Sequence, residues 1–282
     1  MTYPKANANV KIARCIPFAL SKDEPTEMFV SFYAEGIRYD YQVKFDVNHI
    51  LREELNYYPK GSKALFYERN YKGENLQADI KFGVSLRVLQ KNQDSIRENT
   101  LNNHSVLSVC LKNTFKEDIE PLAKLHSYLM THYHHVDGDA ESKGTVEILK
   151  SAYEDGKKHK FIRILDTLYD LISGNHIYYL DELGEDLHYD LLFYYLNIFL
   201  FNSDQSQLLI TSQETTLLSQ DMINENRGAV WFVEKNKDTA ASEYSRGDSY
   251  GLHKNLSLYN SYRIGRLGAK PELGSIFVDL EG

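Results

Sequence analysis

The chain has 282 residues, 42% apolar and 26% charged, so it can form one large globular domain or two small ones. Its formal net charge of -8 argues against sequence-independent capture of nucleic acid by the whole surface, although a local basic patch is compatible with that charge. Cys15 and Cys110 are far apart and lack CxxC spacing. They indicate neither a disulfide framework nor a zinc knuckle, and favour reduced thiols in a cytoplasmic protein.

No segment is long and apolar enough to cross a bilayer. Residues 1–14 lack the apolar stretch of a signal peptide, and the longest apolar run, residues 191–201, is interrupted by Asn197. A transmembrane helix needs about 20 apolar residues. We therefore predict a core helix over this run and no membrane association.

The first third of the chain predicts antiparallel strands. Apolar and polar residues alternate over residues 27–46, with a break at Glu35-Gly36, as in a β-hairpin. A second strand pair is predicted at residues 54–58 and 64–68, joined by the turn Pro59-Lys60-Gly61. Residues 1–82 are therefore expected to form a strand-rich lobe.

The next part predicts helices. The spacing of Ile119, Leu122, Leu125 and Leu129 fits one helix face, so residues 83–140 are expected to form a helical lobe. After a polar break at residues 137–143, apolar residues at helical spacing continue until Ser173-Gly174-Asn175.

The last third alternates strands and helices. Strands are predicted at residues 176–180, 207–211 and 229–234, and helices at 191–201 and 215–224. Strands with little polar alternation, separated by helices, are typical of a parallel sheet covered on both faces. Ligands of such sheets bind beyond the carboxyl ends of the strands. Residues 245–282 are left as irregular structure with one strand at 275–280.

Two adjacent carboxylates, Asp181 and Glu182, follow the first of these strands. In phosphoryl-transfer sites the first acid of such a pair holds Mg²⁺, often through water, and the second polarises the attacking water. A buried strand also ends in an acid simply because the chain has reached solvent. The pair therefore needs supporting context.

Context comes from three further segments. Residues 141–145 (Glu-Ser-Lys-Gly-Thr) open a helix, where free N–H groups suit a phosphate, although an ordinary capping segment has the same composition. Residues 184–188 follow the acid pair at once, and residues 208–213 form the next strand with a polar end.

In this order the segments resemble the ATP-binding-cassette heads of RloA, abortive-infection and OLD-like ATPases. Residues 141–145 are similar to the signature motif, 177–182 to Walker B, 184–188 to the D-loop and 209–213 to the switch. The resemblance extends over residues 16–276. It includes six further segments: 25–27, 36–39, 57–61, 97–100, 230–235 and 262–269.

The resemblance implies an α/β P-loop NTPase fold, with a parallel sheet and flanking helices in residues 141–282 beside the strand-rich lobe. It implies a head-to-tail dimer that binds ATP and Mg²⁺. Asp181 would help hold Mg²⁺ and Glu182 would activate water. Ser142 and Gly144 would contact the γ-phosphate of a nucleotide held mainly by a partner, and Asp186 would lie at the dimer seam.

The chain departs from the family at two points. It contains no GxxxxGK[ST] motif, because neither Gly61-Ser62-Lys63 nor Gly156-Lys157-Lys158 has the preceding glycine at the right spacing. The resemblance then implies a head truncated at its amino end. Such a head is a gene remnant, one half of a split gene that a companion chain completes, or a protein that kept the head for docking. The switch histidine is replaced by Gln213, which orients water by hydrogen bonding but does not titrate near neutrality.

Three functions remain open at this point. The first is an ATPase subunit in bacterial antiphage defence whose nucleotide-dependent dimerisation controls a nuclease or another effector. The second is a non-catalytic head used as an interaction module. The third is a metal-dependent nuclease that uses acids at and after the pair: Asp181, Glu182, Glu185 and Asp186.

A separate group of metal-ligand residue types precedes the signature-like segment: His132, His134, His135, Asp137 and Asp139. A polar loop before a helix explains the same composition without a metal. The many aromatic residues are compatible with stacking on nucleobases and with core or interface packing.

Overall fold

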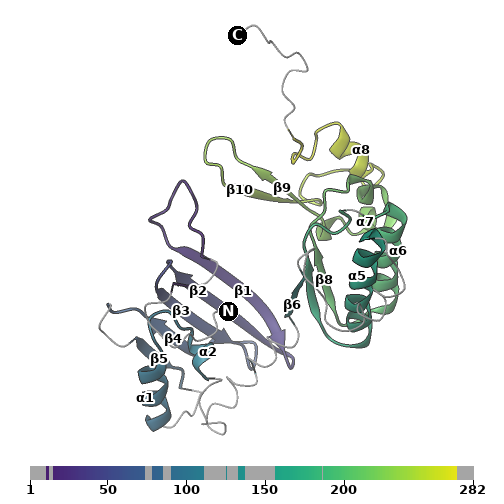
Figure 1. Ribbon diagram of the computed structural model, residues 1–282. Coiled ribbons are helices and arrows are strands. Elements are labelled where there is room, and N and C mark those ends of the chain that lie inside the picture. The colour runs from purple at the N-terminus through teal and green to yellow at the C-terminus, as the bar shows by residue number, and fades with distance from the viewer. Residues whose placement is uncertain are drawn as a thin grey trace. The chain divides into compact units, whose positions relative to one another are not determined.

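The computed structural model describes residues 11–12, 15–73, 78–84, 90–110, 125, 133–136, 156–185 and 187–271 (Figure 1). The chain divides into two compact units, Met1–His132 and Tyr133–Gly282, which are treated separately below. The sequence-based division instead has its boundaries after residues 82 and 140.

The first unit is built on a five-stranded antiparallel sheet in which each strand pairs with its neighbour in the chain. Its strands are β1 (Thr26–Ala34), β2 (Ile37–Phe45), β3 (Ile50–Tyr57), β4 (Ala64–Asn70) and β5 (Asp79–Phe82), followed by α1 (Gln90–Asn99) and α2 (Val106–Cys110). Both predicted strand pairs are confirmed. Glu35 and Gly36 both have positive φ, as a two-residue type I′ turn requires.

A buried carboxylate joins α2 to this sheet. Glu53 of β3 is fully buried and accepts hydrogen bonds from the hydroxyls of Tyr41 (3.1 Å) and Tyr67 (2.6 Å) and from the N–H of Val106 (2.8 Å). Burial raises the pKa of Glu53, although the charge of Arg69 and these donors oppose the rise. The polar centre thus fixes the start of α2 against β3 and β4.

The second unit contains a three-stranded parallel sheet in the order β6 (Tyr133–Val136), β7 (Ile177–Leu180), β8 (Gln207–Ile210). Helix α5 (Gly156–Ser173) leads into β7, and α6 (Tyr189–Asn202) connects β7 to β8. The mixed α/β class, the parallel pairing of β7 with β8 and the core helix over residues 191–201 are confirmed.

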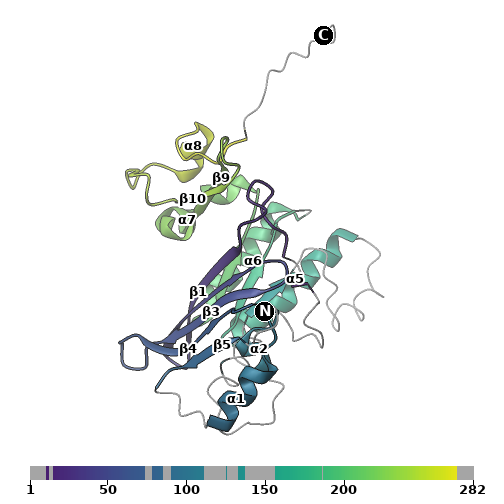
Figure 2. The same cartoon turned by 90° about the vertical axis from the view of Figure 1, so that its left-hand side faces the viewer.

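Within the described residues, α5 and α6 cover one face of this sheet, whereas the sequence predicts cover on both (Figures 1 and 2). The strands lie in the sheet in the same order as in the chain, so both crossovers step across the sheet in the same direction. Because each crossover is right-handed, both helices lie on the same face. The other face carries Ile177, Tyr179 and Leu209, and the Leu209 side chain is 53% exposed.

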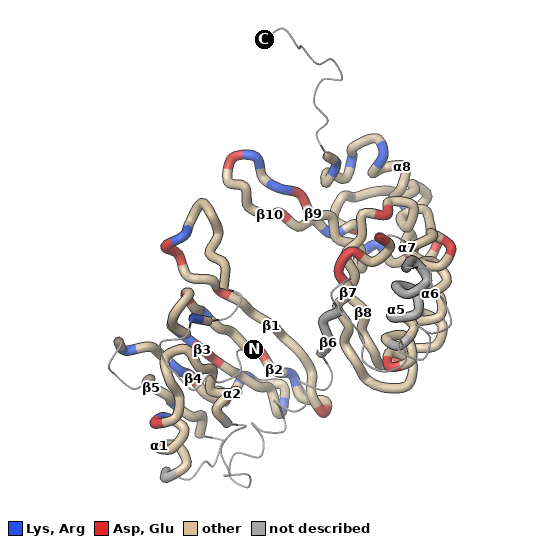
Figure 3. The backbone as a smooth tube through the Cα atoms, in the orientation of Figure 1, with Lys and Arg blue, Asp and Glu red and all other residues tan. Residues whose placement is uncertain are grey.

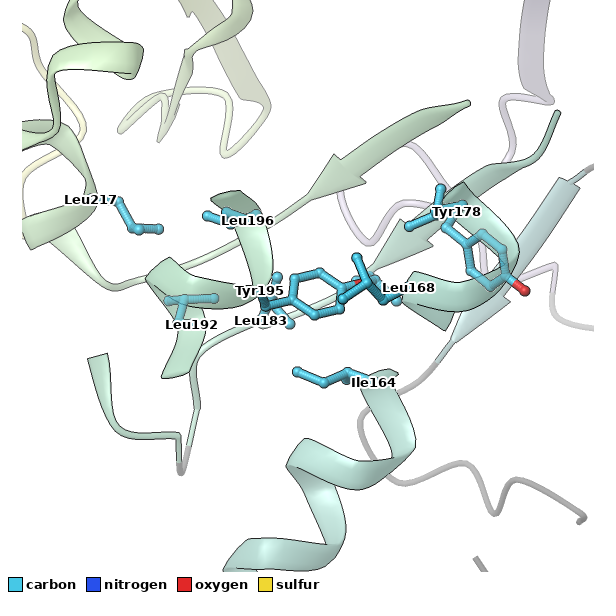
Figure 4. Packing of buried hydrophobic residues seen from close by; sticks show 10 residues of the cluster. Ile164, Leu168, Tyr178, Leu183, Leu192, Tyr195, Leu196 and Leu217 are labelled. Carbon is cyan, nitrogen blue, oxygen red and sulfur yellow. The ribbon is translucent and has the colours of Figure 1, made fainter. Parts of the chain in front are cut away.

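The helix-covered face forms the main core of the unit (Figure 4). Tyr195 of α6 shares a 2.7 Å hydrogen bond between its hydroxyl and that of Thr167 of α5, and burial raises the pKa of Tyr195 to about 12. The buried members of the cluster are Ile164, Leu168, Leu171, Tyr178, Leu180, Leu183, Leu192, Tyr195, Leu196 and Leu217.

The chain after β8 differs from its predicted structure. The single helix expected over residues 215–224 is divided at Gln220 into a 3₁₀ helix, η1 (Thr215–Ser219), and α7 (Asp221–Glu225). A 3₁₀ turn, η2 (Arg227–Ala229), precedes β9 (Trp231–Lys235). Strand β9 pairs antiparallel with β10 (Ser242–Arg246) in a separate two-stranded sheet.

Strand β10 and helix α8 (Leu258–Arg263) were not predicted, because β10 is polar and α8 is short. A second core cluster of Phe232, Leu258 and Leu267 packs β9, the partner of β10, against α8.

Several predictions fall outside the described residues. These are the helical positions 119, 122 and 129, the signature-like segment 141–145, the apolar positions 146–149 and the strand 275–280. Leu125 is helical, as expected. Within the part of the chain that is described, no helix combines the length and apolar character needed to span a membrane.

Candidate functional site

The acid pair lies at the carboxyl end of the parallel sheet. Leu180 and Ile210 are register partners at the ends of β7 and β8, so the residues after them emerge side by side. Asp181 and Glu182 follow β7 and are exposed, and Gln213 follows β8. The Gln213 side-chain nitrogen lies 3.5 Å from Glu182 Oε1, at the outer limit of a hydrogen bond.

Thr211 connects the two acids. Its hydroxyl oxygen accepts a hydrogen bond from the backbone N–H of Glu182 at 2.8 Å and donates to Asp181 Oδ1. Asp181 Oδ1 also accepts from the hydroxyl of Tyr179 at 3.1 Å. Two hydroxyls thus orient the side chain of Asp181. One belongs to Tyr179 of β7, and the other belongs to Thr211, which directly follows β8.

The backbone at the acid pair is strained. Glu182 has φ of +49°, a left-handed conformation that non-glycine residues seldom adopt. It is held by the bond from its N–H to Thr211 and by the next N–H, of Leu183, which donates to the Thr211 carbonyl at 2.8 Å. The Leu183 side chain is buried in the main core and anchors the turn.

The turn continues through Gly184 into α6. Gly184 has φ of +107°, and a Cβ added there would lie 2.9 Å from Leu192 Cδ2. His188 then caps α6, its ring Nδ1 accepting from the N–H of Asp190 at 3.2 Å. A glycine is therefore required where the chain leaves the acid pair and approaches the first turn of α6.

The electrostatics extend toward the β9–β10 hairpin. Burial makes the largest contribution to the raised pKa of Tyr179. Its hydrogen bond to Asp181 and the negative charge of that residue raise the pKa further. Tyr244 of β10 adds a smaller rise. The Tyr179 hydroxyl is therefore held in its protonated form, in which it donates to Asp181.

Most of the other predicted site residues lie outside the described part of the chain. Ser142, Gly144 and Asp186 lie outside the described residues. So do His132, Asp137 and Asp139, while His134 and His135 lie on β6 without described side chains. Among the described residues, no group of three or more His, Cys, Asp or Glu side chains is placed to hold a metal ion.

These side chains fit a Mg²⁺ ion that arrives with a nucleotide. Mg²⁺ retains several waters and takes one or two carboxylates plus substrate phosphates, so it does not need a cage of protein ligands. Asp181 supplies an exposed carboxylate, and the Thr211 hydroxyl fixes one of its oxygens.

Sequence analysis did not assign roles to Tyr179 and Thr211. Thr211 could have been found from its place at the predicted strand end, because the carboxyl ends of adjacent parallel strands meet at the same edge of a sheet. Tyr179 contributes through the hydrogen bond from its hydroxyl to Asp181, and no motif in the sequence indicates that bond.

Comparison with known proteins found no matching family model, no similar curated protein and no similar solved structure. The resemblance to ABC-type ATPases therefore remains a hypothesis based on motif order. The geometry of the described residues is the independent observation that bears on it.

Proposed function

We propose that this chain is the ATP-binding and ATP-hydrolysing part of an ABC-type ATPase that acts in bacterial antiphage defence. A companion segment would supply the phosphate-binding loop, and nucleotide-dependent dimerisation would control an effector. The observation that carries the proposal is the apposition of Glu182 and Gln213, from adjacent parallel strands, beside Asp181.

Each side chain has a role in this proposal. ATP and Mg²⁺ would supply the transferable phosphoryl group and neutralise its charge. Asp181, oriented by Thr211 and Tyr179, would bind the water shell of the metal. Glu182 is exposed and would accept a proton from the attacking water, and the Gln213 amide would orient that water.

The test is Mg²⁺-dependent ATP hydrolysis by the chain fused at its amino terminus to the strand, P-loop and helix of an RloA-class ATPase. We expect hydrolysis by the fusion and a loss of at least about 100-fold in its Glu182→Gln variant, as for removal of a general base. ATP binding that requires the added segment would identify a head that lacks its phosphate loop.

Two variants sharpen this test. Asp204→Asn removes an exposed carboxylate that precedes the amino end of β8 and should leave hydrolysis within about twofold, because surface substitutions away from the chemistry have small effects. Gln213→His should raise turnover, since a histidine titrates near neutrality. A fusion that binds ATP but turns over equally well with Glu182→Gln would refute the role of the acid pair.

A non-catalytic interaction module is the second candidate, and the position of β8 at the edge of the sheet, among the strands that the structure describes, favours it. Gln207 and Thr211 donate backbone hydrogen bonds toward β7, so the N–H groups of Leu208 and Ile210 point away from it. The strand has neither a charge nor a proline, the usual devices that block edge pairing. Association that persists without ATP binding and is lost in Leu208→Pro would support this candidate.

The metal-dependent nuclease is ranked last. Of the four acids it requires, Asp186 lies outside the described residues, and the other three, Asp181, Glu182 and Glu185, do not form a metal-binding group among the described ones. Mg²⁺-dependent cleavage of DNA that is abolished by Glu185→Gln would reverse this ranking.

A further inference from the structure

The β9–β10 hairpin has one buried and one exposed face. Phe232 packs in the core with Leu258 and Leu267, stacking on the ring of Tyr262. Because side chains alternate along a strand, Trp231, Val233 and Lys235 lie on the opposite face.

Strand β10 adds two residues to this exposed face. Arg246 is the register partner of Trp231, and Tyr244 is the partner of Val233. Directly opposed residues of an antiparallel pair share a face. We call the five residues Trp231, Val233, Lys235, Tyr244 and Arg246 the hairpin face. The side chains of Trp231, Val233 and Tyr244 are 55%, 48% and 65% exposed.

The hairpin face combines aromatic rings with positive charge. The Arg246 guanidinium lies over the Trp231 ring, 5.9 Å from its centroid, and also contacts Asp248 at 2.7 Å, which offsets part of its charge. Lys235 adds a second exposed cation. Acidic and basic residues both lie along the hairpin (Figure 3).

The acidic residues of the two strands belong to the other face. Glu234 accepts a hydrogen bond from the N–H of Ala269 at 2.9 Å, and Glu243 accepts from the Asn236 amide at 2.7 Å. The five residues of the hairpin face thus comprise two cations and no acid, with the Asp248 carboxylate beside them in its ion pair with Arg246.

The two aromatic residues of the hairpin face lie on neighbouring strands. Trp231 and Tyr244 are diagonal neighbours, and such pairs lie about 7–8 Å apart in an antiparallel sheet. Aromatic side chains combined with basic residues bind single-stranded nucleic acid, because every base has a face that stacks. Protein interfaces are also rich in Trp, Tyr and Arg, but they are depleted of Lys.

We propose that the hairpin face binds single-stranded nucleic acid, with bases stacked on Trp231 and Tyr244 and phosphates neutralised by Lys235 and Arg246. The face is independent of the proposed ATPase chemistry.

The chain reports this binding itself, because Trp231 is its one tryptophan. Tryptophan fluorescence of the full chain should be quenched saturably by an oligothymidine of about 12 nucleotides, a length within the site sizes of such platforms. Binding should weaken as salt rises, and less steeply in Lys235→Ala, by about one charge in the slope.

Variants separate stacking from charge. Tyr244→Ala should weaken binding about tenfold or more, as expected for loss of one stacked base, while Tyr244→Phe should keep it. Lys254→Ala removes an exposed lysine of the same unit away from the hairpin and should bind like the wild type. Circular dichroism of each variant establishes that the fold is intact.

Three outcomes would overturn the proposal. They are the absence of quenching, equal affinity of Tyr244→Ala and the wild type, and tighter binding of an acidic peptide than of oligothymidine at equal charge. The last would identify the hairpin face as a protein-docking surface. ATP hydrolysis is measured separately, so failure of the ATPase proposal would not affect this test.

Discussion

The hydroxyl oxygen of Thr211 accepts a 2.8 Å hydrogen bond from the backbone N–H of Glu182. The bond joins the carboxyl ends of β7 and β8 and holds Glu182 in its left-handed conformation. One side chain thus supports both the backbone of Glu182 and, through its own proton, the carboxylate of Asp181.

Replacing Thr211 by valine keeps the shape and removes the hydroxyl. We expect the free energy of unfolding to fall by about 0.5–1.5 kcal/mol, the usual net value of a hydrogen bond. Urea unfolding measures this, and hydrogen exchange of the Glu182 amide should accelerate. Thr215→Val is the matched control because the described residues show no hydrogen bond from its hydroxyl. An equal loss in both variants would show that the Thr211 hydroxyl has no special role.

The left-handed backbone of Glu182 predicts an order of stability among its variants. Glu182→Gly should be more stable than Glu182→Ala by about 1 kcal/mol, because only glycine adopts this φ without a steric cost. Both variants lack the carboxylate, so both should lose ATP hydrolysis in the P-loop fusion. Comparison of urea midpoints tests the order, and a more stable alanine variant would contradict the backbone assignment.

A position can require glycine because of its backbone conformation or because a side chain would not fit. Gly184 and Gly251 separate these two causes. Both have positive φ, but an added Cβ at Gly184 meets Leu192 Cδ2 at 2.9 Å, whereas at Gly251 it meets nothing within 4 Å. Gly184→Ala should therefore cost about 1–3 kcal/mol more than Gly251→Ala, the range for overpacking a filled core. Thermal unfolding of the two variants measures the difference. Equal costs would mean that backbone strain alone sets the requirement.

In the first unit, Asp40 predicts a pH-dependent contribution to stability. Burial would raise the pKa of Asp40, but hydrogen bonds from Ser31, Tyr58 and Arg38 outweigh it and leave the pKa below its ordinary 3.8. A lowered pKa stabilises the folded state at pH values above 3.8. This contribution is lost as the pH falls through the pKa that Asp40 has in the folded state.

We therefore expect Asp40→Asn to be less stable than the wild type at neutral pH, with a difference that shrinks as the pH falls below about 4. Urea unfolding over this range tests it. Asp204→Asn, an exposed carboxylate in the other unit, controls for loss of one negative charge. A difference that is constant with pH would show that the pKa of Asp40 is not lowered.

Local patterns in the sequence determined much of the fold. Glu35-Gly36 predicted the first hairpin because few residue pairs tolerate two positive φ angles. The run of residues 191–201 predicted α6, and the order of strand, acids, helix and strand predicted where Asp181, Glu182 and Gln213 would meet. These features depend on neighbours in the chain or on the parallel order of strands, which sequence periodicity records.

Tertiary structure alone decided which surfaces are covered and which side chains meet. The helices cover one face of the parallel sheet because strand order follows chain order, a choice that periodicity does not encode. Polar β10 becomes a strand because Phe232 on its partner is buried against α8. The bonds that orient Asp181 come from Tyr179 and from Thr211, which is 30 residues away in the chain, and only the folded sheet brings that hydroxyl within reach.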